Sequence, residues 1–377
     1  MDKQAELLDQ VRQAAAVGTP LYIRGGGSKA FYGRHCEGQP LDLAGHRGIV
    51  GYEPSELVVT ARAGTPLADI EALLAENGQL FPFEPPHFSS PPPSGERGHD
   101  FHSDNPDSLS PNPSPGGGGA TLGGMVAAGL SGPRRPWGGS VRDAVLGVKL
   151  LNGKGEALRF GGQVMKNVAG YDLSRLMAGA LGSLGVLLEV SLKVLPRPAE
   201  ERTRVFELDA EAAAARQIEW GRLPLSLSGT LYDGERLHVR LCGSAQGVAA
   251  GLEALGGEEV AEGPWRAARE QTLPFFQGNS PLWRISLPAA APALNLPGAG
   301  LTEWGGALRW LRTDLPADLV RQRAAALGGH ATLFRGHDGR GEVFHALVPA
   351  LRVLHMQVKR ALDPQCLFNP GRMYEGL

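Results

Sequence analysis

Three glycine-dense segments constrain this chain more than any other feature of its sequence. They are RGGGSK (24–29), ATLGGMVAAGLSGP (120–133) and AGALGSLGVLLEV (178–190). Glycine clusters expose backbone N–H groups and let another group approach the backbone closely. Each cluster alone is typical of a tight turn. Together they indicate a long ligand with several anionic or polar sections, gripped by amides from separated loops, and a dinucleotide fits that description.

The first segment excludes two familiar nucleotide-binding loops. A Walker A loop needs Gly-Lys-Ser/Thr, whereas here Lys29 follows Ser28 and precedes Ala30. The Rossmann fingerprint needs GxGxxG, and that register occurs nowhere in the chain. The sequence therefore argues against a nucleotide-hydrolysing P-loop protein and against a Rossmann site.

Composition narrows the class of protein further. The chain has 377 residues, enough for two or three compact units of ~150 residues each. A net charge of −2 gives no electrostatic reason to expect nucleic acid or an anionic membrane as a partner. Cys36, Cys242 and Cys366 are too scattered for a zinc site or an iron–sulfur cluster, and such usage is typical of a reducing compartment. We therefore expect no metal bound by this chain.

Two segments bear on targeting and membranes. The N-terminal stretch MDKQAELLDQVRQAAA predicts an amphipathic helix with acids and not a signal peptide. Residues 176–195 are about long enough to cross a bilayer, but Glu189 and Lys193 interrupt them and their second half alternates as a strand does. We interpret this stretch as a glycine-rich buried turn and a strand, with no direct membrane insertion.

Residues 1–200 form the first predicted domain. Its apolar patterns predict helices and strands with short connections: helices at 3–16 and 66–77, and strands at 21–23, 57–61, 144–151, 156–160 and up to the Pro196/Pro198 pair. Residues 89–119 interrupt this domain with Ser, Pro, Gly and Asp. Such a segment cannot bury enough apolar area to offset its ordering entropy, so it predicts a flexible surface insertion.

Two further parts follow. Residues 201–346 predict an antiparallel sheet with helices on one face, typical of a ferredoxin-like α+β unit. Residues 347–377 predict a helix over 347–362, with Leu351, Leu354, Val358 and other apolar residues on one face, and then a Pro-rich tail.

The order of the motifs resembles the FAD-binding domain of the vanillyl-alcohol oxidase / p-cresol methylhydroxylase (PCMH) superfamily. The resemblance rests on RGGGS, TLGGMVAAGLSGP, WGGSVRDAVLGVKLLNGKGE and YDLSRLMAGALGSLGVLLEVSLKVLPRP, in this order. It implies an α+β protein: a two-subdomain FAD-binding domain of the PCMH type, a ferredoxin-like cap domain, and a C-terminal helix and tail that return to the flavin.

Other stretches resemble one branch of that superfamily, the FAD-binding subunits of bacterial glycolate oxidase. They include FEPPH, RFGGQVMKNVAGYDLSRLMAG, LWRISLP, GGALRWL and FNPGRMY. This resemblance implies an oxidoreductase that converts glycolate to glyoxylate within a complex with a second flavin subunit and an iron–sulfur subunit. It also implies a cytoplasmic protein, held peripherally at the inner membrane through its partners.

The resemblance assigns cofactor contacts to specific residues. RGGGSK would be the first pyrophosphate loop, and Ser28 stands where covalently flavinylated relatives carry a His, which implies non-covalent FAD. The other implied contacts are backbone amides of the glycine turns, polar groups after the second turn, and two residues of the tail. The full set is Arg24, Gly25, Gly26, Gly27, Ser28, Lys29, Thr121, Leu122, Gly123, Gly124, Ser131, Gly132, Ser140, Arg142, Asp143, Gly182, Gly185, Val186, Asn369 and Arg372. For Arg142 and Asp143, a local ion pair is an equal alternative.

The catalytic residues stay unassigned. Oxidation of a small 2-hydroxy acid needs an Arg for the carboxylate and a base, commonly His. Relatives that oxidise D-2-hydroxy acids carry a motif resembling GHxGDGNLH, which this chain lacks. His330, His337 and Arg284 are the candidates. The plainer alternatives are a polar pair at a strand edge for the two histidines and a solvated arginine for Arg284. His87 is equally explained as a loop histidine, and Arg134 and Arg135 as solvated arginines.

Three functions therefore stay open. The leading one is an FAD-binding subunit that supports a partner's oxidation site. The alternatives are a self-sufficient FAD-linked 2-hydroxy-acid dehydrogenase and a non-catalytic structural subunit that keeps the fold.

Overall fold

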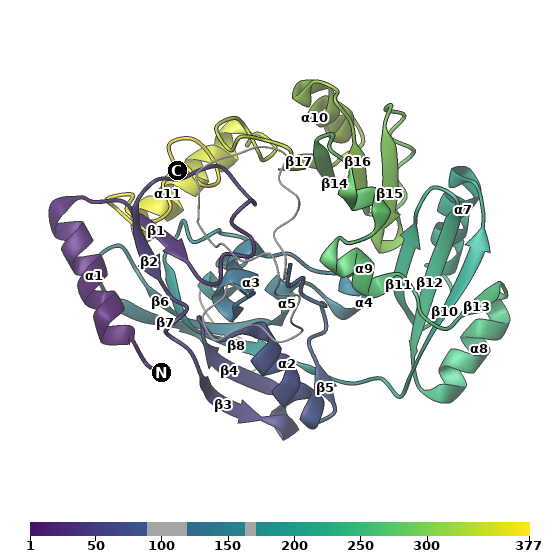
Figure 1. Ribbon diagram of the computed structural model, residues 1–377, viewed down its shortest axis with the longest axis horizontal. Coiled ribbons are helices and arrows are strands. Elements are labelled where there is room, and N and C mark those ends of the chain that lie inside the picture. The colour runs from purple at the N-terminus through teal and green to yellow at the C-terminus, as the bar shows by residue number, and fades with distance from the viewer. Residues whose placement is uncertain (89–118, 163–170) are drawn as a thin grey trace, which may run out of the picture.

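The computed structural model describes residues 1–88, 119–162 and 171–377 (Figure 1). The expected insertion at 89–119 therefore lies outside the described residues, apart from Gly119. In Figure 1 the N-terminal part and the yellow C-terminal helix lie on one side, and the green part from β10 to β17 lies on the other.

An antiparallel sheet forms the centre of the N-terminal part. Its strand order is β3-β4-β8-β6-β7. The central strand β8 is buried along almost its whole length, which explains its near-continuous apolar sequence VLLEVSLK. The bounds of the sheet strands are β3 (Ile49–Glu53), β4 (Val58–Arg62), β6 (Val145–Leu151), β7 (Ala157–Gly161) and β8 (Val186–Lys193).

Helices and short elements cover this sheet. Apolar faces of α1, α2 and α3 join the sheet strands in one hydrophobic core. Two of these helices end in a left-handed glycine, Gly18 after α1 and Gly129 after α3. The elements are α1 (Gln4–Val17), β1 (Leu21–Arg24), β2 (Gln39–Asp42), η1 (Pro54–Glu56), α2 (Leu67–Glu76), β5 (Gln79–Leu80), α3 (Leu122–Ala128), α4 (Arg135–Gly138), α5 (Val141–Ala144), α6 (Leu173–Leu176) and β9 (Leu195–Pro196).

The C-terminal tail joins the first strand of the chain. β1 pairs in parallel with β2, and Leu21 also forms a parallel bridge with Phe368. Leu21 N donates to Leu367 O at 2.7 Å, and Asn369 N donates to Leu21 O at 3.0 Å. Helix α11 (Pro349–Leu362) precedes this tail (Figure 1). Residues from the two ends of the chain thus meet at the start of the RGGGSK loop.

The part from β10 to β17 is a single eight-stranded antiparallel sheet. Its order is β13-β10-β12-β11-β15-β16-β14-β17. Each half repeats the order fourth-first-third-second, so the sheet is two ferredoxin-like halves joined through β11 and β15. The bounds are β10 (Glu200–Glu207), α7 (Ala210–Trp220), β11 (Leu227–Tyr232), β12 (Arg236–Gly243), α8 (Ala245–Leu255), β13 (Glu258–Val260), α9 (Trp265–Glu270), η2 (Pro274–Gln277), β14 (Leu282–Ser286), β15 (Ala299–Glu303), η3 (Trp304–Gly306), β16 (Leu308–Arg312), α10 (Ala317–Ala326) and β17 (His330–Arg335).

The two faces of the second half have different neighbours. Trp283 and Ile285 of β14 pack with Val320 and Ala324 of α10. Alternate residues on the opposite face, such as Leu282, Trp310 and Phe334, belong to another cluster. That cluster also contains Tyr32, Ala128 and Leu181 of the N-terminal part. This face of the sheet therefore lies against the glycine-rich loops.

A buried ionic network joins the two parts. Arg240 of β12 holds Glu84 with both terminal nitrogens, at 2.9 Å and 3.0 Å. The same carboxylate accepts from the backbone N of Arg134 at 2.9 Å, and the guanidinium of Arg134 bonds to Glu201. Arg134 is thus a buried structural residue, contrary to the expectation of a solvated arginine. The fork geometry indicates a strong contact across the boundary between the parts.

We expect Glu84→Gln to lower the free energy of unfolding by about 1–3 kcal/mol, because two guanidinium groups lose their charged acceptor. Burial alone would raise the pKa of Glu84, but Arg240 and then Arg134 more than offset it, so the pKa lies below its ordinary value. A lowered pKa gives stability that is present above the unfolded-state value, about 4.3, and is lost as the pH falls through the folded value.

Urea unfolding at several acidic pH values checks this expectation. The stability difference between wild type and Glu84→Gln should shrink as the pH falls. Glu76→Gln, on the exposed face of α2, is the matched control and should behave as wild type. A difference that stays constant at low pH would contradict the role of the ionised carboxylate.

No helix within the described residues is long and apolar enough to cross a membrane. Residues 176–195, which could be mistaken for a span, form the end of α6, a glycine-rich turn and the buried strand β8. The α+β architecture expected from the sequence is the one observed.

Candidate functional site

The separated glycine segments meet along one groove. Two adjoining cavities, with empty volumes of about 530 and 560 Å³, share Ile23, Gly25, Thr121, Leu181 and Asn369 among their lining residues. The first lies under β1, α3 and the turn at 180–187, and the second runs along RGGGSK toward Arg372. The groove is therefore built by RGGGSK, the Thr121 turn, the Gly182 turn and the C-terminal tail.

Close packing explains the first two glycines of RGGGSK. A Cβ on Gly25 would lie 2.4 Å from Thr121 Oγ1, and one on Gly26 would lie 1.6 Å from the carbonyl oxygen of Gly119. Gly27 has φ +76°, and a Cβ there would meet nothing within 4 Å. The first two glycines let the Thr121 turn approach, and the third gives the loop its left-handed turn beside open space.

This loop carries free donors of the groove. Counting only partners among the described residues, the backbone N–H groups of Gly26, Gly27 and Ser28 make no hydrogen bond. The loop closes through Ala30 N, which donates to Gly27 O at 3.0 Å. Consecutive unpaired amides beside a cavity are a suitable site for phosphate oxygens.

The Thr121 turn contributes shape and few donors. Leu122 N donates to Thr65 O at 2.9 Å, and Gly123 N donates to Ala63 O at 2.7 Å. Gly124 N donates to the Thr121 side chain, which caps α3. The amides at the start of α3 are thus occupied, although Thr121, Gly123 and Gly124 line the groove as the sequence predicted.

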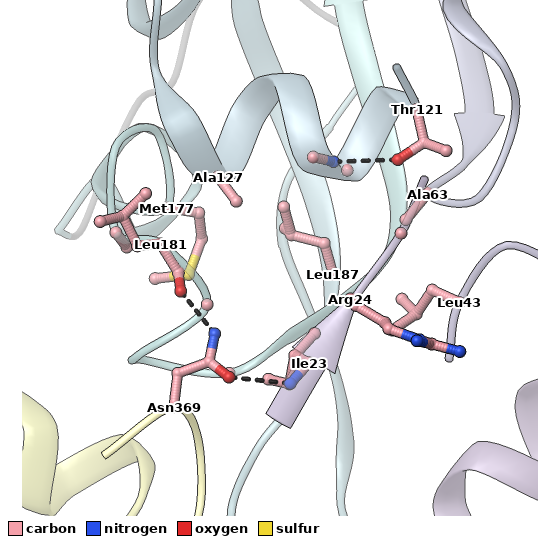
Figure 2. A pocket seen from close by; sticks show the side chains of 16 residues that line it. Ile23, Arg24, Leu43, Ala63, Thr121, Ala127, Met177, Leu181, Leu187 and Asn369 are labelled. Carbon is pink, nitrogen blue, oxygen red and sulfur yellow. Dashed lines mark hydrogen bonds between the residues drawn. The ribbon is translucent and has the colours of Figure 1, made fainter. Parts of the chain in front are cut away.

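The third segment makes room for the tail. Gly182 has φ +73°, and a Cβ there would lie 2.7 Å from Asn369 Nδ2. Figure 2 shows Asn369 between β1 and this turn. Its Oδ1 accepts from Ile23 N at 2.8 Å, and its Nδ2 donates to Leu181 O at 2.6 Å. Asn369 therefore fixes two walls of the groove to each other.

Arg372 holds the far end of the loop. Its guanidinium donates to the carbonyl oxygens of Ala30, Tyr32 and Arg34 at 2.6, 2.9 and 3.0 Å. Asn369 and Arg372 both line the groove, but their side chains are used to position the backbone. The sequence predicted both residues and missed this role, because nothing local in FNPGRMY shows which backbone it will meet.

Lys29 and Arg24 give the groove positive charge. Burial lowers the pKa of Lys29 to about 8, although the carboxylate of Glu270 opposes this shift. The Lys29 ammonium lies 5.5 Å from the ring centre of Phe88. Arg24 lines the first cavity and forms a solvent-exposed ion pair with Asp42 at 3.1 Å.

Other predicted contacts lie outside both cavities. Ser140 and Asp143 form a capping box at the start of α5, which accounts for their side chains without a ligand. The Asp143 carboxylate accepts from Ser140, and no ion pair with Arg142 occurs among the described residues. The Ser131 hydroxyl accepts a hydrogen bond from Val141 N. A Cβ added to Gly132 would lie 2.5 Å from the carbonyl oxygen of Glu84. The residues outside the cavity linings are Leu122, Ser131, Gly132, Ser140, Arg142, Asp143 and Val186.

The candidate catalytic residues are not brought together as one site. His330 begins β17 and His337 lies two residues beyond its end, so a strand of about 17 Å separates the two histidines and they do not form one pair. Among the described residues, no cluster of metal-ligating side chains occurs. Arg284 lies on the sheet face that meets the N-terminal part. His87 contacts Glu71, with 3.0 Å between Nε2 and Oε2.

The sequence of this chain is similar to those of known flavoproteins. Residues 1–90 and 93–161 match the family model described as an FAD binding domain. The chain is 50% identical over 376 residues to the glycolate oxidase subunit GlcE of Escherichia coli (strain K12), an alignment that covers 100% of this chain and 99% of that protein. The chain belongs to the GlcE family of glycolate oxidase subunits. The family expected from the motifs is thereby confirmed.

Two further likenesses extend beyond the GlcE family. The glycolate oxidase subunit GlcD of Bacillus subtilis (strain 168) is 35% identical over 99 residues, covering 26% of this chain and 21% of that protein. The solved structure of p-cresol methylhydroxylase with substrate bound superposes with a TM-score of 0.67 at 14% identity, covering 99% of this chain and 87% of that one. The second likeness confirms the PCMH-type fold.

Proposed function

We propose that this chain is the FAD-binding subunit of a glycolate oxidase complex, which oxidises glycolate and similar 2-hydroxy acids to 2-oxo acids. The observation that carries the proposal is the groove itself. Separated glycine segments line adjoining cavities, and consecutive unpaired amides of one loop face the space between them. The relatives named as glycolate oxidase subunits support the choice of reaction.

The residues present fit a dinucleotide. The amides of Gly26, Gly27 and Ser28 would donate to the diphosphate, with Lys29 adding positive charge. Asn369 and Arg372 would keep the loop and the Gly182 turn in place. Bound FAD would supply the acceptor for the hydrogen removed from the alcohol carbon.

The cofactor is held without a covalent bond in this proposal. Ser28 follows the glycines of the first loop, and a serine hydroxyl does not form the flavin linkage that a histidine makes at that place in flavinylated relatives. Arg372, at the far end of the groove, donates hydrogen bonds to backbone carbonyl oxygens.

Partners complete the proposed enzyme. Cys36 is buried, Cys242 is partly exposed and Cys366 is exposed, and they lie in different parts of the fold. Onward electron transfer therefore belongs to a second flavin subunit and an iron–sulfur subunit. The chain would work in the cytoplasm, peripheral to the inner membrane through these partners.

Purification of the chain, alone and with its partner subunits, tests the proposal. We expect a yellow protein with flavin absorbance whose flavin is released into the supernatant when acid precipitates the chain. A colourless chain that takes up no FAD on dialysis would refute the cofactor assignment. Flavin that stays with the acid pellet would refute the non-covalent one. In the complex, glycolate should bleach the flavin absorbance, and failure to do so with all subunits present would refute the reaction.

A further inference from the structure

Arg284 has an unusual place in the sheet from β10 to β17. It pairs with Trp310 on one side and Thr332 on the other, so these three residues share a face. Its neighbours Trp283 and Ile285 point the other way, under α10. Leu282, Trp310 and Phe334, on the same face as Arg284, pack with Tyr32 of the N-terminal part. The guanidinium thus lies between the sheet and the loop that continues from RGGGSK.

The guanidinium of Arg284 has no acceptor among the described residues. No hydrogen bond or ion pair with a described residue reaches it, and it lies over the ring of Trp304, whose centre is 5.1 Å from Cζ. Burial lowers the pKa of Arg284, while Tyr32 opposes this shift and Arg135 adds to it. Arg284 is half-buried, and a half-buried guanidinium without a paired acid is a suitable place for an anion.

The surroundings add positive charge and aromatic walls. Arg135 also lies over Trp304, at 4.6 Å, and the Tyr32 hydroxyl has no hydrogen-bond partner among the described residues. Glu303 is the carboxylate that acts on the pKa of Arg284, and its effect is smaller than those of Tyr32 and Arg135. Its carboxyl accepts from Trp310 Nε1 at 2.7 Å, and burial raises its pKa to about 7, so it does not supply a full negative charge.

The sheet face that carries Arg284 packs toward the proposed cofactor groove. Leu181 and Ala128, which line the second cavity, belong to the same apolar cluster as Tyr32, Trp304 and Phe334. The second cavity and the sheet face that carries Arg284 therefore belong to one packed region of the molecule.

We propose that Arg284 binds the carboxylate of a small 2-hydroxy acid, in a pocket formed by β14, Trp304 and the Tyr32 loop, so that this chain holds a substrate site of its own. The inference rests on the proposed function for the identity of the acid. Arg284 supplies a planar fork that matches a carboxylate, and Tyr32 supplies a hydroxyl that can bond to a second oxygen of the acid.

Calorimetric titration of the purified full chain, loaded with FAD, tests the site with glycolate and with neutral glycolamide. We expect glycolate to bind, glycolamide to bind at least about tenfold more weakly, and Arg284→Met to raise the Kd for glycolate at least about tenfold, as for loss of a charged hydrogen bond. Arg284→Lys keeps the charge without the fork and should give an intermediate Kd. FAD content should stay at the wild-type level in both variants.

The matched control is Arg321→Met. Arg321 lies over Trp283, with 5.4 Å from Cζ to the ring centre, on the opposite face of the same sheet. It should bind glycolate as wild type does. Glycolate that fails to bind to the FAD-loaded wild-type chain would overturn the inference and leave the cofactor assignment intact, and so would an unchanged Kd in Arg284→Met. A chain that takes up no FAD would refute the proposed cofactor instead. Titration of that chain with glycolate would still show whether Arg284 binds a carboxylate.

Discussion

Replacing Gly26 with alanine is expected to lower the affinity of this chain for FAD by about 10- to 100-fold. The added Cβ would lie 1.6 Å from the carbonyl oxygen of Gly119, which is backbone and cannot rotate away as a side chain could. The loop or the segment that leads into Thr121 must shift, and overpacking of this kind costs about 1–3 kcal/mol. Because the shift moves the unpaired amides of Gly27 and Ser28, most of the cost should appear in cofactor binding.

Fluorescence titration of the apoprotein with FAD measures this effect. The control is Gly51→Ala in β3, where an added Cβ meets nothing within 4 Å. Its FAD affinity should equal that of wild type. If Gly26→Ala binds FAD as tightly as the control, the RGGGSK loop does not contact the cofactor and the proposed orientation of the site is wrong.

Lys359→Met is expected to destabilise the chain by about 3–5 kcal/mol, because it leaves a buried carboxylate unpaired. Lys359 Nζ donates to Ser183 O at 2.6 Å, to Asp363 Oδ2 at 2.8 Å and to Phe368 O at 2.9 Å. Asp363 is fully buried and also accepts from the backbone N of Leu367 and Phe368. One ion pair therefore holds α11, the Gly182 turn and the tail together.

Urea unfolding, followed by circular dichroism, gives the stability change. FAD affinity should fall as well, since Asn369 follows Phe368 directly and bridges two walls of the groove. Arg360→Met, at the exposed neighbouring position of α11, should change stability by less than about 0.5 kcal/mol. Equal stability of Lys359→Met and Arg360→Met would show that the pair does not secure the tail.

Local patterns in the sequence predicted many of the elements. The expected helices at 3–16 and 66–77 are α1 (Gln4–Val17) and α2 (Leu67–Glu76), and the strand expected at 144–151 is β6 (Val145–Leu151). Short elements such as β2 and α4 were not predicted, because a few residues carry no measurable period. The repeated pattern in residues 201–346 indicated a ferredoxin-like unit. That two halves join edge to edge through β11 and β15 depends on long-range pairing, which no local signal encodes.

Helix α11 differs from expectation in a similar way. Leu351 and Leu354, predicted on the apolar face of this helix, are about half exposed at 46% and 52%, whereas Leu362 is buried. The apolar period located the helix correctly, but it could not show how far along the helix the packing extends.

The sequence predicted the glycines that line the groove, but it did not predict the residues that hold the walls of the groove in place. Gly25, Gly26 and Gly182 were named from the sequence and line the groove, because close approach restricts those positions to glycine. Glu84, Lys359 and Asp363 were not predicted to matter. Glu84 and Lys359 act through partners more than a hundred residues away, and Asp363 acts by holding Lys359, so the sequence around each looks ordinary.

The bridge between Leu21 and Phe368 has a consequence for biosynthesis. A nascent chain completed only to α11 already contains RGGGSK, yet it lacks the side chain that joins Ile23 to Leu181. The two walls of the groove are therefore joined only after Asn369 has been translated. Early termination shortly after α11 would yield a chain with most of its core and an open groove, which would reach its partner subunits empty.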